Sequence, residues 1–293
     1  MDIIESLKEI TSEENIFVNE PMSKHTTFKT GGIADFLVIP QNKNEMINLL
    51  KLNVSKTIIG NGSNLLVKDG GIRGLVIKTT GLKNYKVDGE YITSEAGMLL
   101  SKLSNIAKEN SLTGLEFACG IPGTLGGAVM MNASAYGGET SNVVIETEYA
   151  DINGNVYTTT NHEFGYRKSI FMDKQYIILE SKLKLSKGNK EEIENKMKEL
   201  MQSRNSKQPI SKPSAGSTFK RPEGHFAGKL IEDAGLKGYK IGGAQVSDLH
   251  AGFIINDGNA TSKDILELIK YIQDKVKNEF GVDLEPEVRI IGE

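Results

Sequence analysis

Two glycine-rich segments could bind an anionic group through main-chain amides. The first is Gly60-Asn61-Gly62-Ser63-Asn64-Leu65, and it follows the apolar run Thr57-Ile58-Ile59, which predicts a buried strand. The second contains Gly120, Ile121, Pro122, Gly123, Gly126 and Gly127. Glycine tolerates positive φ, and successive N–H groups in such a turn can form an anion-binding nest. One segment alone could be an ordinary tight turn, but the two together indicate a dinucleotide.

Neither segment matches a standard phosphate-binding motif. A Walker loop ends in Gly-Lys-Ser/Thr, which neither segment contains. The Rossmann fingerprint needs Gly-x-Gly-x-x-Gly running into a helix, whereas Leu65 takes the sixth position here and the residues 67–71 predict another turn. A bound dinucleotide would therefore belong to a different fold.

Two short segments contain side chains suited to polar chemistry. Arg167 lies in Phe164-Gly165-Tyr166-Arg167-Lys168-Ser169, a predicted turn between strands, and a guanidinium there could bind a carboxylate or phosphate in bidentate fashion. Ser217 lies in Ala215-Gly216-Ser217-Thr218-Phe219-Lys220 and could act as a nucleophile or a proton donor. The Gly-x-Ser-x-Gly nucleophile elbow is absent. A surface arginine and a turn serine are the alternatives.

The segment Leu284-Glu285-Pro286-Glu287-Val288-Arg289-Ile290 predicts a strand with an unusual mixture of charged and apolar residues. Alternation places Glu287 and Arg289 on one face and Val288 and Ile290 on the other. A buried strand with a charged face either lines a site or pairs its own charges. Both interpretations stay open from the residues alone.

Composition excludes several classes of protein. The chain has 293 residues, 38% of them hydrophobic and 25% charged, which is typical of a globular protein with more than one domain. A net charge of −3 without a basic stripe argues against a nucleic-acid partner. No signal peptide and no apolar run of membrane-spanning length is visible, so we expect a cytoplasmic protein without a membrane partner. The one cysteine and four scattered histidines show no metal-ligand spacing, so no metal is expected.

Hydrophobic periodicity predicts two small subdomains followed by a C-terminal region. Helices are expected near 3–10 and 44–52, and strands at 34–40, 56–59 and 75–78. From residue 80 the pattern becomes antiparallel, because Asp88-Gly89 and Asn153-Gly154 are typical of hairpin turns. A charged helix over 190–203 then leads into a loop, 207–215, that suits a linker or a site. A long helix beginning at Thr261 or Ser262 and closed by Gly281 precedes the last strand.

Five of these segments, in this order, resemble the UDP-N-acetylenolpyruvoylglucosamine reductase (MurB) family over nearly the whole chain. The matching blocks are Gly60-Asn61-Gly62-Ser63-Asn64, Ile121-Pro122-Gly123 with Asn132-Ala133-Ser134-Ala135-Tyr136-Gly137, Phe164-Gly165-Tyr166-Arg167-Lys168-Ser169, Ala215-Gly216-Ser217, and Glu285-Pro286-Glu287-Val288-Arg289. The similarity begins at Thr26-Thr27-Phe28-Lys29-Thr30-Gly31-Gly32.

The resemblance implies an α+β protein of the vanillyl-alcohol-oxidase type, with two FAD-binding subdomains and a C-terminal α/β substrate domain. The expected divisions are 1–80 and 81–205 for FAD and 206–283 for the substrate, with the strand over 284–293 a candidate to return to the second subdomain. FAD would be bound non-covalently, since a free buried thiol at Cys119 is favoured over a covalent flavin link involving His25 or Cys119. NADPH would be the hydride donor, and a monomer is expected.

The resemblance also implies a reaction and roles for single residues. Flavin N5 would pass a hydride to the enolpyruvyl β-carbon of a UDP-sugar, and protonation of the α-carbon would give the lactyl ether. Arg167 and Glu287 would polarise the substrate carboxylate and Ser217 would supply the proton, while Tyr166 and Lys207 would contact the substrate. The FAD ligands would be Gly60, Asn61, Gly62, Ser63, Asn64, Leu65, Gly120, Ile121, Pro122, Gly123, Gly126, Gly127, Ala133 and Arg289.

Two departures and two alternatives accompany this interpretation. Arg221 stands where the family commonly has asparagine, and the tyrosine-bearing loop of one subgroup is absent, so a shorter subgroup is expected. One alternative is another FAD-linked alcohol or lactone oxidoreductase of the same fold. The other is a non-redox protein that binds a sugar nucleotide through its glycine loops.

Overall fold

The computed structural model describes residues 3–172 and 174–293, which form two compact units. Unit 1 contains the residues up to Val18 together with Phe36–Asn61 and Gly74–Ser203. Unit 2 contains Asn19–Asp35, Gly62–Arg73 and Arg204–Glu293. The chain passes between the units several times, and one of these boundaries falls inside the first glycine-rich segment.

A four-stranded sheet has the order β1-β2-β5-β3, and three of its strands continue from one unit into the other. Its strands are β1 (Ile16–Pro21), β2 (Ile33–Val38), β3 (Lys56–Ile59) and β5 (Ile72–Lys78). Strands β3 and β5 are parallel, with Lys56 opposite Leu75. In unit 1, α1 (Ile3–Lys8) and α2 (Lys43–Lys51) contribute to the apolar cluster at this sheet. The helix near 44–52 and the strand at 56–59 are therefore confirmed.

The remainder of unit 1 is built on an antiparallel sheet of order β12-β11-β13-β7-β6. Its strands are β6 (Tyr85–Asp88), β7 (Tyr91–Glu95), β11 (Val144–Ala150), β12 (Val156–Thr159) and β13 (Ile177–Lys184). Both predicted hairpins are confirmed. The first turn is centred on Gly89-Glu90 and not on Asp88-Gly89, because Asp88 already pairs with Tyr91. Gly89 has φ +61°, as the first central residue of a II′ turn requires.

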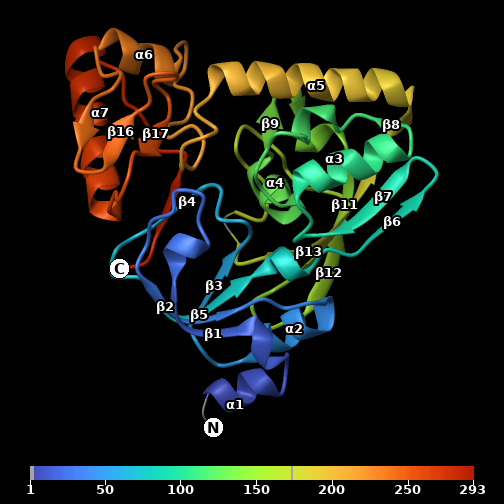
Figure 1. Ribbon diagram of the computed structural model, residues 1–293. Coiled ribbons are helices and arrows are strands. Elements are labelled where there is room, and N and C mark those ends of the chain that lie inside the picture. Colours follow the sequence, from blue (N-terminus) through green and yellow to red (C-terminus); the bar gives the residue numbers. More distant parts are fainter. Residues whose placement is uncertain (1–2, 173) are drawn as a thin grey trace. The chain divides into compact units, whose positions relative to one another are not determined.

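Two helices cover this sheet and enclose the second apolar cluster of unit 1. Helix α4 (Leu125–Met131) packs on β7 and β13, and α3 (Leu100–Glu109) contributes Leu100, Leu103 and Ala107 to the same cluster (Figure 1). Two small antiparallel pairs complete this part: β8 (Leu112–Thr113) with β14 (Ser186–Lys187), and β9 (Ser134–Ala135) with β10 (Gly138–Glu139). The long helix α5 (Lys190–Lys207) begins in unit 1, and its residues from Arg204 on belong to unit 2. Helix α5 extends one turn further than predicted, so Lys207 is its last residue.

Unit 2 has its own core between a small sheet and two helices. The sheet has the order β15-β16-β17 and the bounds β15 (Lys240–Ile241), β16 (Ala244–Val246) and β17 (Ile254–Asn256). Helix α7 (Ser262–Phe280) packs across β15 and β16 and against α6 (Ala227–Asp233). Figure 1 shows α7 beside α6 and β16. Thr261 caps α7 by accepting the N–H of Asp264, and Gly281 ends it at φ +70°. Both predicted ends of this helix are confirmed.

The last strand differs from the prediction in length and in partner. Only β18 (Arg289–Ile291) is a strand, and it runs parallel to β4 (Leu65–Val67), which the sequence did not predict. Pro286 forms one isolated bridge with Phe219, because a proline without an N–H cannot extend a ladder. Val288, just before β18, is buried, but Ile290 is 40% exposed, so the two residues predicted to share a buried face differ in burial. The expected return of this segment to residues 81–205 is replaced by the pairing with β4.

Short 3-10 helices connect several of these elements: Glu13–Asn15, Met22–Lys24, Thr79–Gly81, Glu116–Ala118 and Thr140–Asn142. Among the residues that the structure describes, no helix combines the length and the apolar character that a membrane crossing requires.

We predict that Asp69 stabilises the start of α7 from a distant part of unit 2. Its two carboxylate oxygens accept the main-chain N–H groups of Ser262 at 2.8 Å and Lys263 at 3.0 Å. Asp69→Ala removes these acceptors and should lower the free energy of unfolding by about 1 kcal/mol. Asp274→Ala, on the exposed face of α7, is the matched control and should change it by less than about 0.5 kcal/mol. Equal effects of the two variants in urea unfolding would contradict the assignment.

Candidate active site

Arg167 lies at the tip of a strained turn in unit 1. Gly165 and Lys168 exchange main-chain hydrogen bonds of 3.0 and 3.2 Å, which makes Tyr166 and Arg167 the two residues of the turn. Arg167 has φ +54°, a value that costs a non-glycine residue about 1–2 kcal/mol. Such strain persists where the surroundings enforce it, and it is frequent at functional sites. The Arg167 guanidinium donates to Ser134 Oγ at 2.8 Å.

The end of helix α4 holds this turn in place. Asn132, the left-handed residue that ends α4, donates from its side-chain amide to the carbonyl of Gly165 at 3.2 Å. Ser169 Oγ donates to the carbonyl of Met130 at 2.7 Å. The Asn132-Ala133-Ser134 block and the Arg167 block, about thirty residues apart in the sequence, are therefore one structural feature.

The unit 1 parts of the two glycine-rich segments lie side by side. Asn61 Nδ2 donates to the carbonyl of Pro122 at 2.6 Å. A Cβ on Gly60 would lie 2.6 Å from Thr124 Oγ1, so the glycine is needed for this approach. Thr124 also caps α4 by accepting the N–H of Gly127.

The later half of the second segment uses its amides within the protein. The N–H of Gly126 donates to the carbonyl of Ala96 at 2.8 Å, and a Cβ on Gly126 would lie 2.9 Å from the Ala96 Cβ. The N–H of Leu125 donates to the carbonyl of Met98. Gly126 therefore permits close packing of α4 on β7, a role that the sequence interpretation did not distinguish from cofactor binding.

In unit 2 the first glycine-rich segment is fixed to the N-terminal motif and to the C-terminus. Gly62 has φ +67°, and a Cβ there would lie 2.1 Å from the carbonyl oxygen of His25. Asn64 donates from its side chain to the carbonyl of Glu287 at 3.2 Å, and its main-chain carbonyl accepts the N–H of Arg289 at 3.0 Å. The structure thus brings Asn64, Glu287 and Arg289 together.

Ser217 belongs to the same part of unit 2. The carbonyl of its neighbour Thr218 accepts the N–H of Glu287 at 2.8 Å, and the N–H of Thr218 donates to Gly252 at 2.9 Å. Gly216 before it has φ +80°, and the Ser217 side chain is exposed while Glu287 is half-buried. A serine and a glutamate more than sixty residues apart are thereby held on adjoining main-chain segments.

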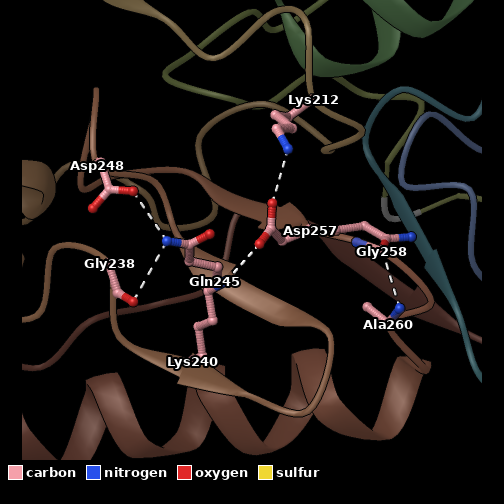
Figure 2. Close-up of polar contacts among 9 residues, drawn as sticks. Lys212, Gly238, Lys240, Gln245, Asp248, Asp257, Gly258 and Ala260 are labelled. Atoms are coloured by element: carbon pink, nitrogen blue, oxygen red, sulfur yellow. Dashed lines mark hydrogen bonds and ion pairs between the residues drawn. The ribbon is translucent and has the colours of Figure 1, made fainter.

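An ion-pair cluster at the end of β17 holds the loop that leads to Ser217 (Figure 2). Asp257 accepts from Lys212 Nζ at 2.8 Å and from Lys240 Nζ at 2.5 Å. The N–H of Asn256 donates to the carbonyl of Pro213 at 2.8 Å. Hydrogen bonds first from Lys212 and then from Lys240 lower the pKa of Asp257 to about 2. Both lysines are exposed, so the cluster orders the loop more than it stabilises the fold.

The two predicted substrate contacts are exposed side chains. Tyr166 is 58% exposed beside Arg167, and Lys207 is exposed in the last turn of α5. Sequence reasoning did not predict a role for Asn132 or Asn256. Each of these asparagines holds two segments together through its side-chain amide, Asn256 by donating to the carbonyl of Phe28 at 3.0 Å. Asn132 stands in a family block and Asn256 in none, but in neither case does the sequence reveal the distant segment that the side chain contacts.

Two protein families match different parts of the chain. Residues 34–160 match the family described as FAD binding domain, and residues 208–291 match UDP-N-acetylenolpyruvoylglucosamine reductase, C-terminal domain. A grass pollen allergen with glucose dehydrogenase activity has a TM-score of 0.52 at 13% identity, covering 64% of this chain and 45% of its own, which shows the fold alone. Fold and family together define a flavoprotein of the vanillyl-alcohol-oxidase type with a C-terminal domain of the reductase family, and the predicted fold class is confirmed.

Full-length relatives identify the family within this class. UDP-N-acetylenolpyruvoylglucosamine reductases of Caldanaerobacter subterraneus subsp. tengcongensis and Clostridium kluyveri are 54% and 52% identical over 99% and 100% of this chain, and over 98% of each relative. The crystal structure of UDP-N-acetylenolpyruvylglucosamine reductase from Thermus caldophilus matches with a TM-score of 0.82 at 36% identity, covering 92% of this chain and 97% of that chain. The chain belongs to the UDP-N-acetylenolpyruvoylglucosamine reductase family.

The first glycine-rich segment fits the FAD that this family uses. In the part of the chain that the structure describes, the main-chain N–H groups of Asn61, Gly62 and Ser63 donate to no protein acceptor. Consecutive unpaired amides at a glycine with positive φ form the kind of nest that holds a pyrophosphate. The residues present are therefore compatible with the cofactor.

We predict that Asp257 titrates near pH 2. Because its pKa in the folded protein lies below the usual 3.8, its ion pairs add to stability above that value and are lost as the pH falls towards about 2. The carboxyl carbon of Asp257, followed by NMR, should show a midpoint of about 2. Lys212→Met should raise this midpoint, because the hydrogen bond from Lys212 is the largest cause of the shift. A midpoint near 3.8 in the unaltered protein would exclude the cluster.

Proposed function

We propose that the protein reduces the enolpyruvyl ether of UDP-N-acetylglucosamine to UDP-N-acetylmuramate, a step of peptidoglycan precursor synthesis, with NADPH as reductant. The observation that carries this proposal is the similarity, over essentially the whole chain, to proteins named UDP-N-acetylenolpyruvoylglucosamine reductase. The enzyme is an FAD-dependent oxidoreductase of that family. A non-redox sugar-nucleotide protein would have no need of the FAD-binding domain.

The proposed chemistry assigns separate tasks to three side chains. FAD, when bound, accepts a hydride from NADPH and supplies it to the enolpyruvyl β-carbon. Negative charge then develops on the α-carbon and its carboxylate, and a fixed cation lowers the energy of that charge. Arg167 is the proposed cation, since its strained turn and its bond to Ser134 fix the guanidinium before substrate arrives. Its planar donors match a carboxylate.

Glu287 and Ser217 are proposed to act on the same substrate from unit 2. The main chain of Glu287 is fixed on both sides, by Thr218 and by Asn64, so its side chain starts from a defined position. A protonated Glu287 would donate to the substrate carboxylate. The exposed Ser217 hydroxyl would give its proton to the α-carbon, which completes the lactyl ether.

The remaining ligands are assigned by family position and local structure. For FAD, which is bound non-covalently, we propose Gly60, Asn61, Gly62, Ser63, Asn64, Leu65, Gly120, Ile121, Pro122, Gly123, Gly126, Gly127, Ala133 and Arg289. For the substrate we propose Tyr166 and Lys207, in an organisation of two FAD subdomains over 1–80 and 81–205 and a substrate domain over 206–283. We further propose that the enzyme acts as a monomer in the cytoplasm, with these small molecules as its partners.

The colour and the NADPH consumption of the purified protein test this function. Protein with FAD should show the flavin band and should consume NADPH at a rate that rises when the enolpyruvyl substrate is added. Colourless protein that takes up no added FAD would overturn the proposal. A flavin band with turnover of an alcohol and oxygen in place of the enolpyruvyl substrate would favour the alternative oxidoreductase.

We predict that Gly62→Ala weakens FAD binding because the new Cβ would collide with the carbonyl of His25. Displacement of the loop should raise the dissociation constant by about ten- to a hundredfold. Gly235→Ala is the matched control, since Gly235 has a similar φ of +71° and a Cβ there would have nothing within 4 Å. Fluorescence titration with FAD measures both. Equal affinities of the two variants for FAD would show that the loop around Gly62 does not contribute to the cofactor site.

We predict that Ser217→Ala separates the two halves of the reaction. Loss of the proton donor should slow reduction of the enolpyruvyl substrate by at least about a hundredfold. Reduction of the flavin by NADPH requires no such proton and should continue at its normal rate. Ser214→Ala, in the same loop, controls for effects on the loop itself. An equal fall of both half-reactions in rapid-mixing experiments would disprove the proton-donor role.

A further inference from the structure

His162 is a buried histidine at the base of the Arg167 turn, and nothing in the proposed chemistry uses it. The residue is only 5% exposed, and its Nε2 lies 2.9 Å from Thr147 Oγ1. Thr147 Oγ1 in turn lies 2.9 Å from Ser181 Oγ, a neighbour across the β11–β13 pair. The imidazole is thereby linked to the centre of the antiparallel sheet of unit 1.

The same histidine is also joined to the turn. Its ring stacks on Phe164 with centroids 4.8 Å apart and planes 1° from parallel. Its carbonyl accepts the N–H of Ile170 at 2.9 Å, which closes the base of the loop whose tip is Tyr166 and Arg167. Phe164 is followed at once by Gly165, where the turn begins. A continuous line of contacts therefore runs from the sheet through His162 to the strained Arg167.

The surroundings of the ring favour its neutral form. Burial lowers the pKa of His162, and a hydrogen bond with the main chain of Thr160 opposes that shift only in part. On β11, Glu146 and Glu148 flank Thr147 and point by alternation to the opposite face, and Tyr149 packs edge-on against Phe171.

Among the described contacts the loop offers no carboxylate to an imidazolium at His162, whose hydrogen bonds are with the main chain of Thr160 and with Thr147 Oγ1. Glu163 and Lys168 are exposed, and the rings next to His162 are those of Phe164 and Phe171. A proton added to His162 would therefore place an uncompensated charge between the sheet and the turn, which is costly in a buried apolar site.

We propose that His162 is a positioning residue for Arg167: its neutral ring holds the turn in the conformation that receives the substrate carboxylate, and its protonation releases that turn. This inference rests on the role proposed for Arg167. Protonation of His162 would then slow reduction of the enolpyruvyl substrate at low pH, because Arg167 binds the substrate carboxylate in that step. Reduction of the flavin by NADPH, which involves no such carboxylate, should not share this sensitivity.

The first test compares the two half-reactions from about pH 8 down to about pH 4, which extends below the usual titration range of histidine because burial lowers the pKa of His162. The KM for the enolpyruvyl substrate should rise by about tenfold per pH unit below the pKa of His162, while the rate of flavin reduction changes little. His162→Phe keeps a ring for stacking but cannot be protonated, so the rise should disappear. His225→Asn, at an exposed histidine of unit 2, should retain it. An unchanged pH profile in His162→Phe would overturn the proposal.

The second test uses the unaltered protein and requires no substrate. In the unaltered protein, NMR signals of the His162 ring and the amides of Gly165, Arg167 and Lys168 should shift with one common midpoint. If the amide signals of the turn do not shift when His162 titrates, the coupling between His162 and the turn is refuted, whether or not the enzyme reduces its substrate. If the shifts occur but the enolpyruvyl compound is not reduced at any pH, the proposed function fails and the positioning of the turn stands.

Discussion

The parallel pairing of the last strand with β4 is the interaction on which the chemistry of unit 2 depends. Arg289, Ile290 and Ile291 lie opposite Leu65, Leu66 and Val67, and hydrogen bonds between Gly70, Gly71 and Glu293 continue the contact. A parallel pair requires a long crossover, and here more than two hundred residues separate the two strands. Because Asn64 bonds to the main chain on both sides of Val288, the pairing sets Glu287 next to the first glycine-rich segment. The connection through Thr218 then brings Ser217 to the same place.

In unit 1, tertiary contacts hold Arg167 in a left-handed conformation that arginine disfavours. The end of α4 and the base formed by His162 and Ile170 enforce the turn at Gly165–Lys168, so the cost of the left-handed Arg167 is borne by packing elsewhere. In both units a glycine or asparagine with positive φ stands where two segments must meet closely, Gly62 in one and Asn132 in the other. The functional groups are thus placed by the main chain and its contacts, with little contribution from the exposed ion pairs.

Local patterns in the sequence predicted the elements that form from neighbouring residues. The hairpins at 85–95 and 144–159 and the capped helix α7 follow from turn residues and periodicity, and all are present. The pairing of β18 with β4 could not be predicted in this way, because a run of three apolar residues gives little signal and its partner lies more than two hundred residues away. The family resemblance supplied Arg167, Ser217 and Glu287 as candidates. It did not supply the strain at Arg167, the hold of Asn132 or the packing role of Gly126, which arise only from tertiary contacts.

Reduced FAD in this protein should give its electrons to an enolpyruvyl sugar nucleotide. A single turnover without oxygen tests it most directly: the protein is first bleached with one equivalent of NADPH and then mixed with UDP-N-acetylglucosamine enolpyruvate. The flavin band should return, and one equivalent of UDP-N-acetylmuramate should form. A flavin that stays bleached in the presence of this compound, with no lactyl ether formed, would contradict it.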